Sequence, residues 1–501
     1  MKKLYILSAL LTMGTIASAQ NYEEILRFSR FTTTGTARSA AMGGAFGALG
    51  GDLSTLSTNP AGIGVFRKSE AAFTPLLNFN DIKSGNRTAN KTSFQMGTLG
   101  AVFSLYTPDF NWRGFNFGIN YTNLSNYNRQ MDIAVLNSST SQLNAYALQA
   151  DNIQPKDLNP FTLGQAYETF LINPNDQLYY SPAVGEGELV NQYKLLKEDG
   201  YQGEYAFSFG TNYKDKLYLG MTIGLQTTYF KTRSQYTELG EENAPSGFDS
   251  YDFFENVRIN GVGTNLKFGA IYRPIPELRI GAAIHTPTWY NMNYRRETYI
   301  DAYYWTPEDP NTGRESQISQ SQGYYDKYDF DMRTPWRAIL SIATVLNQKA
   351  IISADYEYVD YGSAKYTAGP YSRFYDETNA AIKSTYTAAH NFRVGAEYRF
   401  NSQFSLRAGY NYMGSPYKRK EYSFVNSIPG GDKIQTVSGG IGLNFGQFYC
   451  DAAYSYRFAK DETIFYYTET QIDNLIHTVM AEPVSNKYHE HQARITVGVR
   501  F

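Results

Sequence analysis

The chain has 501 residues, 16% of them aromatic, and its mean hydropathy of −0.44 is in the range of soluble proteins. No long apolar run follows the first twenty residues, which excludes a helical membrane protein and leaves a large soluble β-sandwich or a membrane β-barrel. The formal net charge of −2 gives no electrostatic basis for binding nucleic acid, and a single cysteine, Cys450, excludes an intramolecular disulfide and a structural zinc site.

Residues 1–19 have the pattern of a secretory signal peptide. Lys2 and Lys3 form a basic start, residues 4–16 are apolar, and three small residues precede Gln20. The apolar part is too short to span a membrane. No cysteine follows the small residues, so a lipoprotein anchor is not expected. We predict export and cleavage near Ala19.

Residues 20–67 are predicted to form a plug, or hatch, inside a barrel. The stretch AMGGAFGALGGDLSTLSTNPAGIG at 41–64 contains seven glycines and does not alternate like a strand. About 48 residues without a disulfide or metal are too few for an independent domain, so a barrel lumen is the available host. Glycine lets the backbone turn tightly in a narrow bore, and Asn59 before Pro60 favours a turn. Phosphate-binding and dinucleotide-binding glycine motifs are absent.

Residues 68–501 contain runs in which apolar and polar side chains alternate strictly. In the run 392–400, for example, Arg393, Glu397 and Arg399 share one face. A slip of one residue would turn all three toward lipid, where an arginine near the midplane costs about 2–4 kcal/mol. Runs of about ten residues match the length that a tilted strand needs to cross a bilayer. The alternation therefore favours a transmembrane barrel over a soluble sandwich.

Fourteen strands are expected, and their connections are alternately short and long, as in outer-membrane barrels. An even number places both termini on the periplasmic side. The final Phe501 after an alternating strand is typical of the signal read by the barrel-assembly machinery. The predicted strands are 68–80, 94–106, 114–126, 202–213, 216–230, 258–272, 278–294, 335–347, 349–361, 388–400, 403–414, 435–446, 447–459 and 491–501.

The longest connection, 127–201, is unusually long for a structureless loop. Residues 143–150 and 163–171 have the composition of short helices. We expect them to cap the extracellular mouth of the barrel, with a partly disordered surface loop as the alternative.

The stretch ARSAAMGGAFGALGGDLSTLSTNPAGIG at 37–64 resembles the N-terminal hatch of the FadL/TodX family of outer-membrane transporters for hydrophobic compounds. LRIGAAIHTPTWY at 278–290 and TPWRAILSIATVLNQKAIISADYEYVDYG at 334–362 are also similar to that family. The resemblance implies a monomeric fourteen-stranded barrel closed by its hatch. It further implies passive uptake of a lipophilic ligand from outside, with sideways exit through a gap in the wall.

Few side chains suggest chemistry. His285 has the parity of the lumen face, where it would bind a carboxylate or simply fill a wet interior. His489 and His491 share one strand face, either as a metal or haem contact or as rim histidines, and Asp355 and Glu357 are expected to face inward. No catalytic triad can be assembled, so we predict no enzyme, no cofactor and no metal. The predicted gating residues of the hatch are Gly43, Gly44, Asn59, Pro60, Ala61 and Gly62.

Several functions are compatible with a plugged barrel. The leading hypothesis is uptake of hydrophobic molecules such as long-chain fatty acids, with the ligand and outer-membrane lipid as partners. The runner-up is a surface anchor or shuttle in protein export, which predicts a sealed lumen and large ordered outer loops. A haem receptor is a variant of the first hypothesis, and a barrel hydrolase is the third. TonB-coupled transport is disfavoured because the plug is too small for a wide 22-stranded lumen.

Overall fold

The computed structural model describes residues 23–32, 35–242, 244–305, 316–367, 375–418, 423–424, 432–472 and 475–501. The predicted signal peptide lies outside the described residues.

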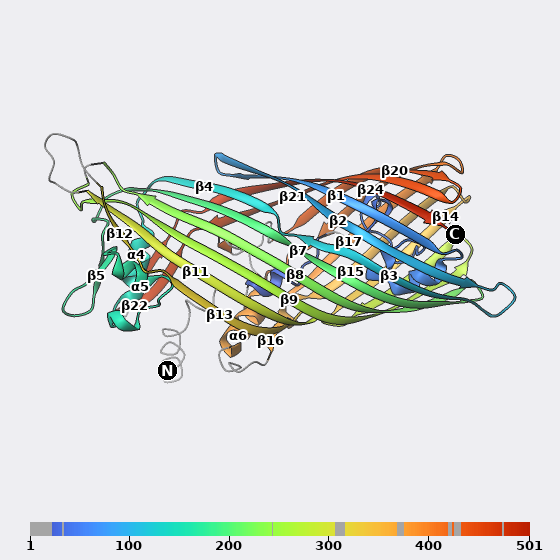
Figure 1. Cartoon of the computed structure of the whole chain (residues 1–501), viewed down its shortest axis with the longest axis horizontal. Helices are drawn as coiled ribbons and strands as arrows, with labels where there is room; N and C mark the ends of the chain where they lie inside the picture. Colours follow the sequence, from blue (N-terminus) through green and yellow to red (C-terminus); the bar gives the residue numbers. More distant parts are fainter. Residues whose placement is uncertain are drawn as a thin grey trace.

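The chain forms a closed antiparallel barrel of fourteen strands, which confirms the predicted fold class (Figure 1). Each strand pairs with its neighbour along the chain, and the last strand pairs with the first to close the wall. Two of the fourteen are each built from two segments. In order the strands are β1 (Glu70–Ser84), β2 (Arg87–Tyr106), β3 (Trp112–Asn126), β7 (Val190–Tyr213), β8 (Leu217–Leu239), β9 (Phe248–Ile275), β10 (Leu278–His285) with β11 (Trp289–Trp305), β13 (Tyr324–Arg333) with β14 (Arg337–Leu346), β15 (Ala350–Asp360), β17 (Ala388–Arg399), β18 (Phe404–Met413), β20 (Ile434–Phe445), β21 (Phe448–Ile464) and β24 (Val484–Arg500).

The two-segment strands are neighbours, and a Thr-Pro pair interrupts each of them. Proline has no backbone N–H to donate to a ladder, so pairing stops at Pro287 and Pro335. Thr288, after the first proline, and Thr334, before the second, restore the link: the Thr288 backbone N–H donates to the Thr334 hydroxyl at 2.8 Å, and the Thr334 N–H donates to the Thr288 carbonyl at 3.1 Å. The wall therefore continues through the break.

The outer surface of the barrel is apolar and the inner surface is polar, as the alternation predicts. On β17, Phe392, Val394 and Tyr398 are about half exposed, whereas Asn391 and Glu397 are buried in the lumen. Burial of polar groups requires hydrogen-bonding partners, and here the plug and the facing strands supply them. The register of each strand is fixed by this division.

The strands β7, β8 and β9 are longer than the sequence predicts, with 24, 23 and 28 residues. A tilted strand crosses the bilayer in about ten residues, so these strands continue well beyond it. The short strand β4 (Arg129–Ser138) pairs with β7 outside the membrane and takes up part of the predicted 127–201 loop.

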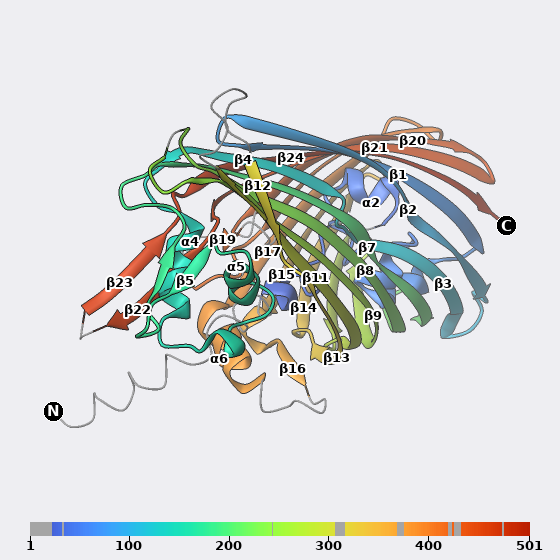
Figure 2. The same cartoon turned by 60° about the vertical axis from the view of Figure 1, so that its left-hand side comes forward.

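The rest of that loop folds into a roof over the mouth, together with a hairpin near the C-terminus (Figure 2). Both predicted helices are present, but the second ends earlier than expected because Phe170 adopts a left-handed conformation with φ of 62°. The roof elements are α4 (Gln142–Ala150), η2 (Pro155–Asp157), α5 (Leu163–Glu168), β5 (Ile172–Pro174), β6 (Tyr180–Pro182), β22 (Tyr467–Ile472) and β23 (Leu475–Met480).

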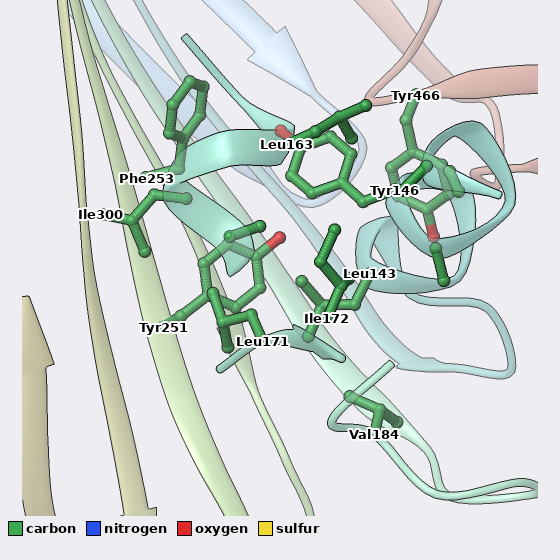
Figure 3. Packing of buried hydrophobic residues seen from close by; sticks show 14 of the residues in the cluster. Leu143, Tyr146, Leu163, Leu171, Ile172, Val184, Tyr251, Phe253, Ile300 and Tyr466 are labelled. Atoms are coloured by element: carbon green, nitrogen blue, oxygen red, sulfur yellow. The ribbon is translucent and has the colours of Figure 1, made fainter. Parts of the chain in front are cut away.

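An apolar cluster fixes the roof to the long strands (Figure 3). Leu143 and Tyr146 of α4 and Leu163 of α5 pack with Tyr251 of β9 and Ile300 of β11. The capping Ser141 of α4 also donates to Glu238 at the top of β8. The roof is thus a packed structure and not a loose loop.

The remaining elements lie in the plug and in the outer connections. A helical turn spans 23–27, and no helix in the described ranges has both the length and the apolar character needed to cross a membrane. These elements are α2 (Ala37–Ala41), α3 (Thr55–Thr58), η1 (Pro60–Val65), β12 (Ser316–Gln320), η3 (Tyr361–Ser363), β16 (Lys365–Thr367), α6 (Tyr375–Thr385) and β19 (Ser423–Phe424).

Candidate transport path

The plug comprises the described residues from 23 to 67 and lies inside the lumen (Figure 2). Its apolar side chains form small clusters that all include residues of the barrel wall. Ile25, Leu26 and Phe28 join a wall cluster that includes Phe230 and Tyr290. Farther along, the apolar residues of α3 and η1 pack with Val102, Ala206 and Tyr449. The wall therefore supplies the hydrophobic core that so short a segment lacks.

Asn59 connects two parts of the plug with the wall. It caps η1, since its side-chain oxygen accepts from the Ala61 N–H at 3.1 Å, and Pro60 occupies the first helical position. The Asn59 amide nitrogen donates to the Gly47 carbonyl at 2.6 Å and to the Ala270 carbonyl of β9 at 3.4 Å. Asn59 and Ala61 are fully buried, and the Gly62 carbonyl accepts from the Gly51 N–H at 3.1 Å.

The glycines of the plug permit a close approach to the wall. Gly43 has φ of +65°, its N–H donates to Ser438, and an added Cβ would lie 2.8 Å from the backbone of Tyr410. Gly44 also has positive φ and lies beside Arg393. A residue with a Cβ rarely adopts this backbone conformation, and its Cβ would not fit at so short a distance from the wall.

The wall carries its own glycines where the plug touches it, and they are not among the residues predicted from the sequence. Gly210, Gly220 and Gly269 stand side by side on β7, β8 and β9, opposite η1. A Cβ on Gly269 would lie 1.9 Å from the Asn59 side-chain oxygen. In the sequence, each of these residues is a glycine at a lumen-facing position of a strand in which apolar and polar side chains otherwise alternate. Only the strand pairing reveals that the three form one flat surface.

Arginines of the wall hold the plug by its backbone carbonyls. Arg457 donates to the Thr32 carbonyl at 3.0 Å and Arg494 to the Gly35 carbonyl at 3.4 Å. Arg337 and Arg279 donate to the carbonyls of Ser29 and Leu49. Hydrogen bonds from a charged donor are stronger than those between neutral groups. The plug is therefore held to the wall by several strong contacts that are independent of one another.

Glu357 organises the charged part of this contact region. It forms ion pairs with Arg337 at 3.0 Å and with Arg393, and it accepts from Asn391 at 3.2 Å. Asp355, two residues earlier, accepts the backbone N–H of Phe46 at 3.0 Å and also binds Gly47. Both predicted inward-facing carboxylates therefore contact the plug or the arginines that hold it.

Two cavities meet at the plug. The first, called here the polar cavity, has a volume of about 80 Å³ and is lined by Gly43, Gly44, Lys267, His285 and Arg337 among others. The second, called the apolar cavity after Ile82, Ile434 and Tyr488, has a volume of about 100 Å³, and four arginines and two glutamates also belong to its lining. Thr32 of the plug lines both.

His285 lies in the polar cavity, at the lumen parity that the sequence predicts. It is buried, and its Nε2 atom is 2.8 Å from the Thr58 carbonyl of the plug. Lys267 lies in the same cavity wall and is paired with Glu204. The imidazole is thus placed between the plug and a basic group.

His489 and His491 alternate with the lumen-facing residues of β24 and lie on its outer face, where His489 also contributes to the lining of the apolar cavity. Their Nδ1 atoms are 2.5 Å from the hydroxyls of Tyr456 and Tyr454, respectively. Among the described residues, no group of three or more His, Cys, Asp or Glu side chains is arranged to hold a metal ion.

Strands β2 and β3 are only partly paired with each other, and the boundary between them is called here the seam. Backbone pairing between these strands covers Thr98 to Tyr106 and goes no farther toward the outside. Beyond it, side chains bridge the strands: Asn126 donates to Ser93 at 3.2 Å and Asn123 to Gln95 at 3.4 Å. A bulge at Gly97 changes the register of β2 against β1 at the same level.

A third cavity, of about 10 Å³, lies inside the seam. It is lined by Gly97, Asn123 and Asn126 of the wall and by Thr32 and Gly35 of the plug. The volume has room for about one water molecule, so the seam is closed in this conformation.

Replacing Asn59 by alanine removes the cap of η1 and the bridge to Gly47. Loss of an N-cap costs about 1 kcal/mol, and the buried Ala61 N–H also loses its acceptor. We expect the plug to loosen while the barrel stays folded. Limited proteolysis of the purified protein would show faster cleavage within residues 35–67, with Thr58→Ala, which removes only a hydroxyl that bonds back to the Ser54 carbonyl, as the control. Equal cleavage rates would contradict this role.

The N-terminal part of the plug should respond to pH. Burial raises the pKa of Glu24 from 4.5 to about 8, so the neutral form is favoured when the helix is docked. The docked state is therefore most stable below pH 4.5 and weakens as the pH rises toward 8. We expect the hydrogen-exchange protection factors of residues 23–32 to fall between pH 4.5 and pH 8 and to level off above that. In Glu24→Gln the protection should stay constant, and an unchanged pH dependence in that variant would contradict the assignment.

Comparison with known proteins agrees with this geometry. A sequence profile described as "Outer membrane protein transport protein (OMPP1/FadL/TodX)" matches residues 212–489, more than half of the chain. No curated protein matches the sequence. A Pseudomonas aeruginosa FadL homologue is similar in structure, with a TM-score of 0.56 and 16% identity over 94% of this chain and 99% of its own. The Pseudomonas putida toluene transporter TodX has a TM-score of 0.50 and 14% identity over 94% and 99%.

These structural likenesses support the fold, and the profile match identifies the relationship. The chain belongs to the FadL/TodX family of outer-membrane transport proteins, which carry hydrophobic compounds and are not enzymes.

Proposed function

We propose that this protein mediates passive uptake of hydrophobic small molecules with an anionic head group, such as long-chain fatty acids. The observation that carries the proposal is the meeting of the apolar cavity and the polar cavity at Thr32. A ligand with an apolar tail and a carboxylate uses both spaces. Toluene is named for the similar TodX, so small aromatic hydrocarbons are the competing ligand class.

The charges around the two cavities support an acid as ligand. Seven basic side chains and three acidic ones, apart from His285 and His489, line them together, and Lys267 is also paired with Glu204, which is not part of either lining. In a low-dielectric lumen this excess attracts a carboxylate. The basic residues are Lys267, Arg337 and Arg393 in the polar cavity and Arg27, Arg30, Arg129 and Arg457 in the apolar cavity; the acids are Glu357, Glu198 and Glu490. An uncharged aromatic molecule does not gain this charge–charge attraction.

The seam is the proposed exit. A lipophilic ligand gains little from entering the aqueous periplasm, because it can pass directly into the membrane. The cavity at the seam is bounded by the plug at Thr32 and Gly35, where Arg457 and Arg494 hold the backbone. We infer that release of these contacts, with the Gly43–Gly44 turn and the Asn59–Gly62 segment as the gating elements, opens the path.

Binding of palmitate, its methyl ester and toluene to the detergent-purified protein tests this function. Native mass spectrometry should detect one bound palmitate, with the methyl ester at least tenfold weaker, because only the acid interacts with the basic side chains. Tighter binding of toluene than of palmitate would identify an aromatic-hydrocarbon channel. Absence of any bound lipophile would reject uptake of hydrophobic molecules.

A surface anchor is the second candidate, and the packed roof over the mouth favours it. Such a protein would co-purify with an exported protein and bind no lipophile in the same assay. For either function we expect a monomer. We also expect recognition by the barrel-assembly machinery at Phe501, which is 60% exposed at the end of the chain.

A further inference from the structure

Four lysines form a row on the outer wall of the barrel. Lys83 of β1 pairs with Lys487 of β24, and Lys487 pairs with Lys460 of β21. Lys433 directly precedes Ile434, the β20 residue that pairs with Ala459, and so continues the row beside Lys460. All four side chains are exposed. With strands about 4.8 Å apart, the row spans about 14 Å.

Such a row is unfavourable by itself, because like charges directly opposite each other on neighbouring strands repel. In the described part of the chain, none of these lysines forms an ion pair, whereas Lys91 and Lys267 do. Two carboxylates share this outer surface, Asp81 one row below Lys83 and Glu462 beyond Lys460. The excess of positive charge calls for an anionic partner.

The surface below the row is suited to a lipid. Phe79 and Tyr454 are 44% and 52% exposed, and Tyr456, His489 and His491 lie beside them on the outer face. The Tyr456 and His489 rings are stacked with centroids 5.9 Å apart. Aromatic side chains with a polar tip are typical of the membrane–water interface of barrels. The row therefore lies just outside the apolar band.

The row also lies at the outer end of the barrel. Lys83 is followed by the last residue of β1 and by the turn at Gly85, on the side opposite the short periplasmic connections. Lipids that contact the lysine row therefore belong to the outer leaflet of the membrane.

We propose that the lysine row binds the phosphate groups of a phosphorylated glycolipid of the outer leaflet. Lysine binds phosphate as a point charge, and four lysines over about 14 Å can neutralise two separate phosphates. The acyl chains of the glycolipid then lie on the aromatic and apolar surface below. A phosphorylated lipid is favoured over free phosphate because the lysine row lies next to an apolar surface, so that both the phosphate and the acyl chains find contacts.

The test uses purified bisphosphorylated lipid A and the full-length protein in detergent. The variant carries Lys83→Gln, Lys433→Gln, Lys460→Gln and Lys487→Gln. The matched control replaces Lys68, Lys214, Lys216 and Lys349, four exposed lysines at the opposite end, in the same way. Heat-modifiable electrophoretic mobility confirms folding of each protein.

We expect wild type and control to bind lipid A equally in native mass spectrometry and the variant to bind at least tenfold more weakly. Dephosphorylated lipid A should bind the wild type as weakly as lipid A binds the variant. This part of the experiment requires no substitution in the protein. Equal binding by variant and wild type, or by both forms of lipid A, would overturn the proposal. Displacement of lipid A by millimolar inorganic phosphate would do so too, by identifying a site for free anions.

Discussion

Replacing Gly269 by valine should leave the barrel folded but make it leaky. A Cβ at this position would lie 1.9 Å from the Asn59 side-chain oxygen and 3.0 Å from the Ala61 nitrogen. Strand β9 cannot retreat, because Gly269 pairs with Gly220 on one side and Ala283 on the other. The plug must therefore move off the wall. We expect at least a tenfold rise in single-channel conductance in planar bilayers, and sensitivity of cells to a large antibiotic such as vancomycin.

Gly439→Val is the matched control for this experiment. Gly439 is also a strand glycine, but a Cβ there would lie 3.6 Å from its nearest neighbour, the Arg407 carbonyl. It should leave conductance unchanged. A folded Gly269→Val protein with the conductance of the wild type would mean that the plug tolerates displacement from β9 without opening.

Replacing Glu357 by alanine should cause the largest loss of stability. The carboxylate pairs with Arg337 and Arg393, and all three side chains lie inside the barrel. Removing one partner of a buried pair costs about 3–5 kcal/mol, because the remaining charges are left uncompensated. The midpoint of urea unfolding in detergent, followed by tryptophan fluorescence, should fall accordingly. Because Arg337 also holds Ser29, the plug should become sensitive to protease before the barrel unfolds.

Asp132→Ala supplies the comparison for Glu357. Asp132 pairs with Arg87 at 2.8 Å, but their side chains are 32% and 43% exposed. Exposed pairs contribute about 0–1 kcal/mol, so this variant should unfold almost like the wild type. Similar losses for both variants would argue that burial in the lumen is not what makes Glu357 important.

The barrel could be predicted from the sequence because lipid imposes a strict rule on each strand. Arg393, Glu397 and Arg399 must share the lumen face, and this fixes the register of β17 without any structural information. The same rule does not apply above the membrane. The upper halves of β7, β8 and β9 are surrounded by water and by the roof, so their alternation is weaker and their lengths were underestimated.

The candidate path was predictable only in part. The composition of residues 41–64 predicts a plug, and parity places His285 in the lumen. The Gly210–Gly220–Gly269 surface, the arginine contacts at Thr32 and the seam each depend on which strands lie side by side and at what height. These relations come from three-dimensional register, to which a single sequence gives no direct access. The bulge at Gly97 illustrates this, because one additional residue changes the parity of β2.

Closing the seam with a covalent bond is the most direct test of lateral exit. Ser93→Cys and Asn126→Cys, introduced together with Cys450→Ser, place two thiols where the native side chains hydrogen-bond at 3.2 Å. The control pair Asn293→Cys and Asp329→Cys lies between fully paired strands, where the side chains are 2.6 Å apart. Uptake of labelled palmitate by cells should stop when the seam pair is oxidised, resume on reduction, and be unaffected in the control. Undiminished uptake with the seam fully cross-linked would contradict exit through the wall.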